Sequence, residues 1–388
     1  IVLTFSHVSF KTLIKTIYTN QETTLTFSPI LTRTTEALKE VVVEDNRDEV
    51  SGLIKVDPKQ IENIPGMNQG VENVLMTLAG VNNSNELSTQ YNVRGGNFDE
   101  NLIYVNGIEL YRPFLIRSGQ QEGLSAINPA MVSNVRFSAG GFQAKYGDKM
   151  SSVLDITYKT PQRFGLQVNA SLLGGSITYE DLNATGTLST LLSARYRNTN
   201  LFVSKKDIAS SIRPEFIDLQ SFISYLPNSR FKLDFLGNMT VNTYNYKPET
   251  RRTKFGSIVN PQELVVLYEG QEEDRFESLF GAVRGNYIID DQWNMSISTT
   301  VYHTQEKEHF DIEATYNLGE INTDFGSENF GEVENISGIG SQLNHARNGI
   351  DGLISTTAFK VNYKNSNALV EMGVTYTYED FKDRMKEW

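Results

Sequence analysis

The protein has 388 residues and a formal charge of -12, and it contains no cysteine. Lys and Arg dominate nucleic-acid grooves, so this charge argues against a nucleic-acid partner, and the lack of cysteine excludes disulfides and thiolate metal sites. No apolar run reaches the roughly 18 residues of a membrane-spanning helix. The strands of a membrane β-barrel need only about 9–11 residues each, so a barrel and a soluble β-sandwich are both compatible with the composition.

Residues 1–38 predict short β-strands. The segments IVLTFSHVSF, TLIKTIYTN and TTLTFSPI alternate β-branched or aromatic residues with polar ones, and polar turns separate them. We interpret this zone as the C-terminal part of a small β-sandwich, within which the chain begins. A polar connector, TRTTEALKE, follows it.

Residues 51–161 predict a compact α+β unit. A helix is indicated at VENVLMTLAGV, where the apolar residues have helical spacing and Gly80 ends the pattern. Short strands are indicated at YNVRGG, NLIYVNGIEL, VSNVRFSAGG and VLDITYK, with a helical turn near Pro129 and a hairpin turn at Asn106-Gly107. The helical face consists of Val71, Val74, Leu75 and Leu78.

From residue 162 onward the pattern becomes one of long alternating strands. In the segment 229–244 one face is apolar and the other is polar, and 276–289 and 293–302 repeat this alternation. A tilted strand of such length exceeds the apolar band of an outer-membrane barrel, which is about 25 Å tall. The apolar face of 229–244 consists of Phe231, Leu233, Phe235, Met239 and Val241, and the polar face of Lys232, Asp234, Asn238, Thr240 and Asn242.

The connections between these strands alternate in length. Short turns fall at 227–229, 290–292 and 364–367, and long polar stretches fall near 198–214, 246–274 and 310–345. Bacterial barrels combine short periplasmic turns with long outer loops, whereas a sandwich has no reason to keep this order. We count about nine strands, the last from Ala368 to near Met385. An open sheet would leave its edges unpaired in lipid, so we expect the chain to end partway through a barrel.

An ordered series of motifs supplies a family resemblance. ENIPG with VENVLMTLAGV, YNVRGG, DENLIYVNGIELYRP and INPAMVSNVRFSAGGFQAKYGDKMSSVLDITYK together resemble the plug of the TonB-dependent receptor family. The resemblance implies a mainly β protein in which an α+β plug (51–161) lies inside a transmembrane antiparallel barrel that begins at 162–388 and has 22 strands when complete. It also implies active import of a nutrient, such as a siderophore, oligosaccharide or peptide, across the outer membrane of a Gram-negative bacterium.

Upstream of the plug, LKEVVVED resembles the Ton box of members with an N-terminal carboxypeptidase-regulatory-like extension, to which residues 1–38 would belong. A short β-segment between polar stretches can add as an edge strand to a partner sheet. The alternative is the last strand of the sandwich or a linker strand. The resemblance implies that a periplasmic TonB-type energy transducer binds this segment, within a linker at 39–50. Its residues are Glu40, Val41, Val42 and Val43.

The resemblance also suggests residues for plug contacts and for substrate. Arg94 in YNVRGG matches a family arginine that faces barrel acids; alternatively, it caps a plug turn. Apical loops at 82–90, 97–101 and 111–122 are expected to face the substrate, and their aromatic and arginine residues suit a chelate, a sugar or a peptide equally. The alternative is that these residues are merely solvated. The predicted substrate-binding residues are Asn97, Tyr111, Arg112, Phe114, Arg117 and Gln120.

Catalysis finds little support in the sequence. The four histidines form no HExxH motif, and neither a GxSxG elbow nor a Walker phosphate loop is present. We therefore expect no enzymatic activity, cofactor or metal, and we interpret the acidic run at 269–274 as solvated charge in an outer loop.

Two other functions remain open from the sequence. One is a non-transporting plugged barrel that serves as a subunit of a secretion or assembly complex, or as a signalling receptor. The other is a soluble carbohydrate-binding β-protein, whose apolar strand face would need a packed partner sheet. Expected partners of the transporter include outer-membrane lipid and a surface lipoprotein lid or other outer-membrane subunits.

Overall fold

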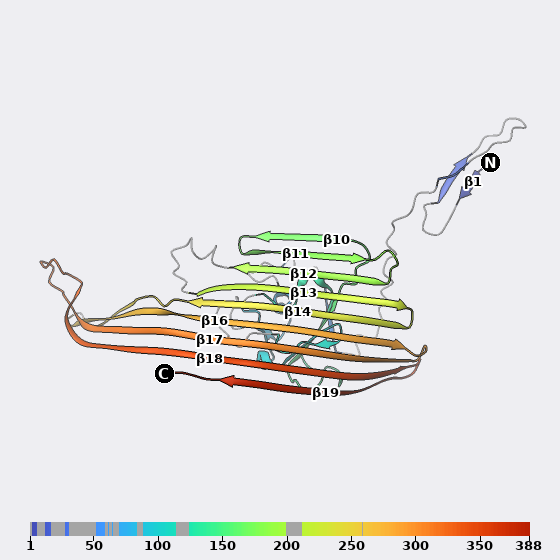
Figure 1. The fold of residues 1–388 in the computed structure, drawn as a ribbon. Coiled ribbons are helices and arrows are strands. Elements are labelled where there is room, and N and C mark those ends of the chain that lie inside the picture. The colour runs from blue at the N-terminus through green and yellow to red at the C-terminus, as the bar shows by residue number, and fades with distance from the viewer. Residues whose placement is uncertain are drawn as a thin grey trace, which may run out of the picture. The chain divides into compact units, whose positions relative to one another are not determined.

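The computed structural model describes residues 2–5, 12–16, 28–30, 52–58, 61, 64, 70–83, 88–113, 124–198, 212–257 and 259–388. The chain divides into two compact units, residues 1–50 and residues 51–388. In the first unit, β1 (Val2–Phe5) and β2 (Leu13–Thr16) form an antiparallel pair, which confirms two of the predicted strands (Figure 1). The third predicted strand and the Glu40–Val43 segment lie outside the described residues.

A five-stranded mixed sheet organises residues 54–158 of the second unit. Its strand order is β3-β8-β9-β6-β7, and a separate two-stranded sheet pairs β4 with β5. The central β6 and β9 pair in parallel and are almost wholly buried, so they read as near-continuous apolar runs rather than as alternating ones. The strands are β3 (Ile54–Val56), β4 (Val81–Asn82), β5 (Asn92–Val93), β6 (Asn101–Val105), β7 (Ile108–Glu109), β8 (Val132–Ser138) and β9 (Ser152–Tyr158).

The helical elements of this region are short. The predicted helix is confirmed as α2 (Val71–Leu75), with Val71, Val74 and Leu75 buried, and Gly80 follows it at φ 83°. The helical turn is confirmed as the 3-10 helix η3 (Pro129–Met131), where the Asn128 side chain accepts a hydrogen bond from the Ala130 amide at 3.1 Å. A second 3-10 helix, η2, spans Phe98–Glu100. Within the described residues no helix is long and apolar enough to span a membrane.

A ten-stranded antiparallel sheet forms the rest of the second unit, and we call it the wall. Nine strands lie side by side in chain order, as Figure 1 shows, and β15 pairs with β16 off this path. The predicted count of about nine strands is therefore confirmed. The strands are β10 (Gly165–Ser171), β11 (Gly174–Leu182), β12 (Leu188–Asn198), β13 (Ile212–Asn228), β14 (Phe231–Tyr246), β15 (Arg251–Gly256), β16 (Pro261–Ile288), β17 (Trp293–Ile321), β18 (Val333–Lys364) and β19 (Leu369–Arg384).

The two faces of the wall differ as the alternation predicts. On β14, Leu233, Phe235 and Met239 are exposed on the outer face, while Asp234 is only 5% exposed on the inner face. The inner face contributes Leu191, Phe222, Leu236, Phe280 and Tyr302 to one hydrophobic core shared with the five-stranded sheet and α2. The mixed sheet with its helices, which we call the plug, thus packs on the inner face of the wall.

Two of the predicted long loops are largely strand, and this prediction was wrong. Strand β15 and the first half of β16 occupy most of 246–274, while β17 and β18 extend far into 310–345. Ladder hydrogen bonds continue here, but both faces carry polar residues, so the sequence shows no apolar alternation to mark the strands. The short turns at 290–292 and 364–367 are confirmed, and the one predicted at 227–229 lies at 229–230, between β13 and β14.

Candidate functional site

One buried arginine of the wall donates hydrogen bonds to the backbone of the plug. The Arg195 guanidinium donates from Nη2 to the Ser125 carbonyl at 2.7 Å and from Nη1 to the Ile127 carbonyl at 3.4 Å. The amide of Gln220 donates to the intervening Ala126 carbonyl at 2.9 Å. Three consecutive plug carbonyls therefore accept hydrogen bonds from side chains of the wall. We call Ser125–Ile127 with Arg195, Asp218 and Gln220 the plug clasp.

The clasp contains an ion pair that is almost fully withdrawn from solvent. Arg195 and Asp218 are direct cross-strand partners in β12 and β13, and Arg195 Nε lies 2.7 Å from Asp218 Oδ2. Their side chains are 8% and 3% exposed. The other carboxylate oxygen, Asp218 Oδ1, accepts from Asn238 at 2.8 Å and from Gln220 at 3.2 Å. A buried pair is stable only when its remaining hydrogen-bonding groups are satisfied, and this one is.

Three more polar contacts join plug and wall. The Tyr158 hydroxyl donates to Gln220 Oε1 at 2.9 Å, and the Asn128 amide donates to Ser193 Oγ at 2.6 Å. Nearer the short-turn ends of the strands, Arg284 Nη1 donates to the Asn106 carbonyl at 2.7 Å. Because a hydrogen bond replaces one to water, each such contact contributes only about 0.5–1.5 kcal/mol to holding the plug on the wall.

A buried carboxyl connects the clasp to the plug helix. Glu72 of α2 is 2% exposed, and its Oε1 accepts a hydrogen bond from Ser125 Oγ at 2.7 Å. Burial raises the pKa of Glu72 above its usual value, while the Ser125 hydrogen bond and the charge of Arg195 oppose that rise. No hydrogen-bond partner reaches Glu72 Oε2 among the described residues.

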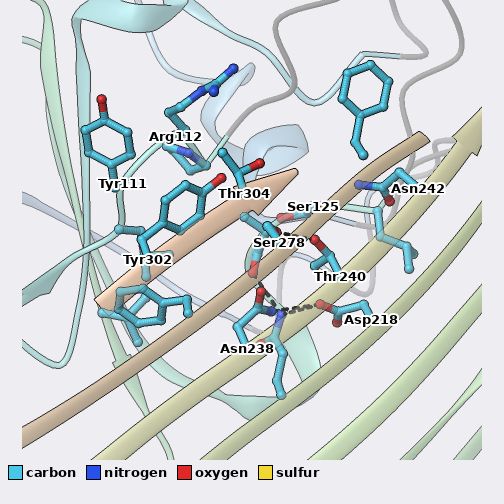
Figure 2. A pocket seen from close by; sticks show the side chains of 18 of the residues that line it. Tyr111, Arg112, Ser125, Asp218, Asn238, Thr240, Asn242, Ser278, Tyr302 and Thr304 are labelled. Atoms are coloured by element: carbon cyan, nitrogen blue, oxygen red, sulfur yellow. Dashed lines mark hydrogen bonds between the residues drawn. The ribbon is translucent and has the colours of Figure 1, made fainter. Parts of the chain in front are cut away.

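A cavity of about 110 Å³ lies beside the clasp, between the plug segment at 110–113 and strands β13, β14, β16 and β17. Figure 2 shows the lining side chains, with hydroxyl and amide groups from the wall and Tyr111 and Arg112 from the plug. Arg112 has a φ of 45°, a left-handed conformation that is uncommon outside glycine, and such conformations cluster at ligand-binding sites. Six of the polar lining residues are Tyr111, Arg112, Asn238, Thr240, Ser278 and Thr304.

The structure brings only part of the predicted substrate site together. Tyr111 and Arg112 line the cavity, whereas Asn97 is exposed ahead of η2 and is not a lining residue. Phe114, Arg117 and Gln120 lie outside the described residues. The substrate role of these residues stays a prediction.

Arg94 lies at a turn with a φ of 50° and an exposed side chain, near Gly80 and Gly140 of the plug. Its predicted contact with barrel acids stays a prediction. Within the described residues, Arg195, Arg284 and Arg112 each make a contact between plug and wall. None of the sequence motifs singled out Arg195. Its inward position follows from strand alternation, but its partners depend on the strand register and on the plug's placement.

The acidic run at 269–274 is not an outer loop, and that placement was wrong. The run lies within β16, where Glu272 and Asp274 are 9% and 1% exposed. Their carboxylates lie within 4.8 Å of each other and of the Glu308 carboxylate, a set of oxygen donors that could hold a cation. The composition of the run predicts solvated charge, because nothing in it shows which residues turn inward.

Comparison with known proteins finds one family model that resembles part of the chain. Residues 45–152 match the family model of the TonB-dependent Receptor Plug Domain. This match covers the part of the chain in which the ordered motifs predict a plug. No curated protein matches the sequence significantly.

Several solved receptors resemble the structure weakly. The siderophore receptor PirA from Pseudomonas aeruginosa shares 13% identity with a TM-score of 0.37, over 85% of this chain and 74% of its own. FpvA from P. aeruginosa bound to heterologous pyoverdines shares 10% with a TM-score of 0.43, over 88% and 54%. BauA, the ferric preacinetobactin receptor from Acinetobacter baumannii, shares 10% with a TM-score of 0.39, over 85% and 61%. These values are too low to transfer a ligand from those receptors to this chain.

Proposed function

We propose that this chain is the plug and the first barrel strands of an importer in the outer membrane of a Gram-negative bacterium. Substrate binds from outside, a periplasmic TonB-type partner pairs with Glu40–Val43, and force transmitted through the plug opens a path along the wall. The carrying observation is the plug clasp, which holds three plug carbonyls to the wall by contacts that can break and re-form.

The outer face of the wall supports a membrane location. On β17 the outward residues Trp293, Ile297 and Val301 are apolar and exposed, and His303 and Lys307 follow them on the same face. From Trp293 to Val301 the strand climbs about 20 Å at 45° tilt, close to the apolar band of about 25 Å in barrels. The Trp293 and Tyr363 rings lie 4.7 Å apart at the short-turn end, where such barrels carry an aromatic girdle.

The partner contact is tested in the intact protein by a proline substitution. Val42→Pro removes a backbone donor and blocks strand addition, whereas Val42→Ile keeps both donor and β-propensity. We expect Val42→Pro to abolish uptake while leaving substrate binding unchanged, and Val42→Ile to transport normally. Deletion of Glu40–Val43 should behave like the proline variant. Undiminished uptake after that deletion would contradict TonB-dependent import and favour a non-transporting plugged barrel within a larger complex.

A further inference from the structure

In the cavity beside the plug clasp, most of the polar lining groups are neutral, and apolar side chains such as Leu236 and Phe280 line much of the rest. Thr240, Ser278 and Thr304 supply hydroxyls from β14, β16 and β17, and Asn238 and Asn242 supply amides from β14 (Figure 2). Thr240 Oγ1 and Ser278 Oγ lie 2.5 Å apart. Hydroxyls both donate and accept, and amides offer one group of each kind. A ligand that itself carries hydroxyls can match such a wall at many points.

Three tyrosines line the same cavity, and two of them lie close together. The rings of Tyr111 from the plug and Tyr302 from the wall have centroids 5.6 Å apart at an interplanar angle of 52°. Such rings present apolar faces together with a polar hydroxyl. A ligand that alternates C–H surface with hydroxyls can therefore contact both parts of each ring.

Every charge among the described lining residues is already paired. Arg112 Nη1 lies 2.7 Å from Glu306 Oε1, and Asp218 is held by Arg195 at 2.7 Å. Glu277 accepts from Arg275 Nε at 2.6 Å. An anionic ligand would have to break the Arg112–Glu306 pair to gain a cation, and it would leave a carboxylate of about 14% exposure uncompensated. The described lining thus disfavours a charged ligand.

Resting on the transport function proposed above, we propose that this cavity receives an uncharged, hydroxyl-bearing end group of the substrate, of the oligosaccharide class. A cavity of roughly 150 Å³ accommodates one benzene ring. At about 110 Å³ this cavity admits part of a sugar ring, so the remainder of the ligand lies outside it. The cavity selects the end of the ligand rather than enclosing the whole of it.

The first experiment measures binding to the intact protein in detergent by calorimetry. The probes are neutral oligomers of glucose, mannose and galactose, each matched with the uronic-acid oligomer of the same linkage. At least one neutral oligomer is expected to bind, and its uronic counterpart to bind at least about tenfold more weakly. Failure of every neutral oligomer to bind, or equal or tighter binding of the uronic series, overturns the proposal.

Matched variants locate that binding. Thr304→Val removes a lining hydroxyl with little change in shape, and Thr299→Val makes the same change on the exposed outer face of β17. Thr304→Val is expected to weaken neutral-oligomer binding about tenfold, and Thr299→Val to leave it unchanged. Asn238→Ala with Asn245→Ala gives a second pair on β14, with Asn245 exposed. If the cavity variant and the outer-face variant change oligomer binding equally in both pairs, the assignment to this cavity is overturned.

A charge-release variant tests the electrostatic argument in the opposite direction. Glu306→Gln leaves Arg112 unpaired at the cavity, so binding of the uronic oligomer should rise about tenfold while the neutral one changes little. An unchanged preference overturns the argument from paired charges. Uptake assays separate this inference from the transport function. If the protein takes up another substrate and Thr304→Val does not change that uptake, the cavity assignment is rejected and transport stands. If the oligomer binds but is not taken up, transport is rejected and the cavity assignment stands.

Discussion

Arg195 and Asp218 face each other across β12 and β13 and form a buried ion pair whose guanidinium also holds the Ser125 carbonyl of the plug at 2.7 Å. One side chain thus serves the wall and the plug together. Removing the Arg195 side chain should therefore lower the stability of the protein and weaken the contact between plug and wall.

Replacing Arg195 by Met should be strongly destabilising. The variant leaves Asp218 buried without its cation, at a cost of about 3–5 kcal/mol in the free energy of unfolding. Denaturant titration of the purified protein measures that loss, and entry of a large hydrophilic antibiotic into cells reports a loosened plug. Arg230→Met, at an exposed turn, is the control. Adding Asp218→Leu to Arg195→Met should recover part of the stability, and equal stability of Arg195→Met and Arg230→Met would contradict a structural role.

Glu72 should make stability fall as pH rises. Because burial raises its folded pKa above the unfolded value near 4.5, the folded state holds a proton that the unfolded state releases between those two pKa values. The contribution of Glu72 is thus most favourable below about pH 4.5 and is lost as pH rises through the folded pKa. Glu72→Gln keeps an oxygen that accepts from Ser125 and should flatten this slope, as denaturation at a series of pH values would show. The exposed Asp99→Asn should keep it, and an unaltered slope in Glu72→Gln would refute the assignment.

Gly107→Ala should loosen the plug at the Asn106-Gly107 turn. Gly107 has a φ of 73°, and an added Cβ would lie 2.5 Å from Arg284 Nη1, the atom that donates to the Asn106 carbonyl. The left-handed backbone alone costs an alanine about 1–2 kcal/mol, and displacing Arg284 adds to this. Gly147→Ala is the control, because Gly147 has an ordinary φ and open space around it. Thermal denaturation that shows equal midpoints for the two variants would be inconsistent with the described turn.

Phe235→Arg should impair insertion into lipid. Phe235 is 41% exposed on the outer face, near the middle of the apolar stretch of β14. An arginine at the bilayer midplane of a barrel costs about 2–4 kcal/mol, whereas one near the interface costs about 0–1 kcal/mol. Asn245→Arg, further along the same strand, is the control. Unfolding from lipid vesicles measures both, and a cost for Phe235→Arg no greater than that for Asn245→Arg would argue against a lipid-facing surface.

Local patterns predicted the elements well, and they failed where position depended on distant partners. The Val71, Val74 and Leu75 face, the Asn106-Gly107 turn and the apolar outer face at Leu233 and Phe235 each follow from short-range spacing. Beyond the apolar band the paired strands carry no alternation of apolar and polar residues. The sequence therefore predicts loops at β15 and in the outer halves of β17 and β18, where the structure has strands. Arg195 is the corresponding case in the site, because its significance arises only when β12, β13 and residues 125–127 meet.

The clasp also bears on the order of assembly. The carbonyls of Ser125, Ala126 and Ile127 take their side-chain donors from β12 and β13, which are made later in the chain. A plug folded ahead of the wall would have to leave those acceptors to water and then dehydrate them on docking. The final packing of this segment therefore belongs to the step in which barrel strands gather around the plug, and a plug expressed by itself should exchange its amide hydrogens around residues 125–127 much faster than in the intact protein.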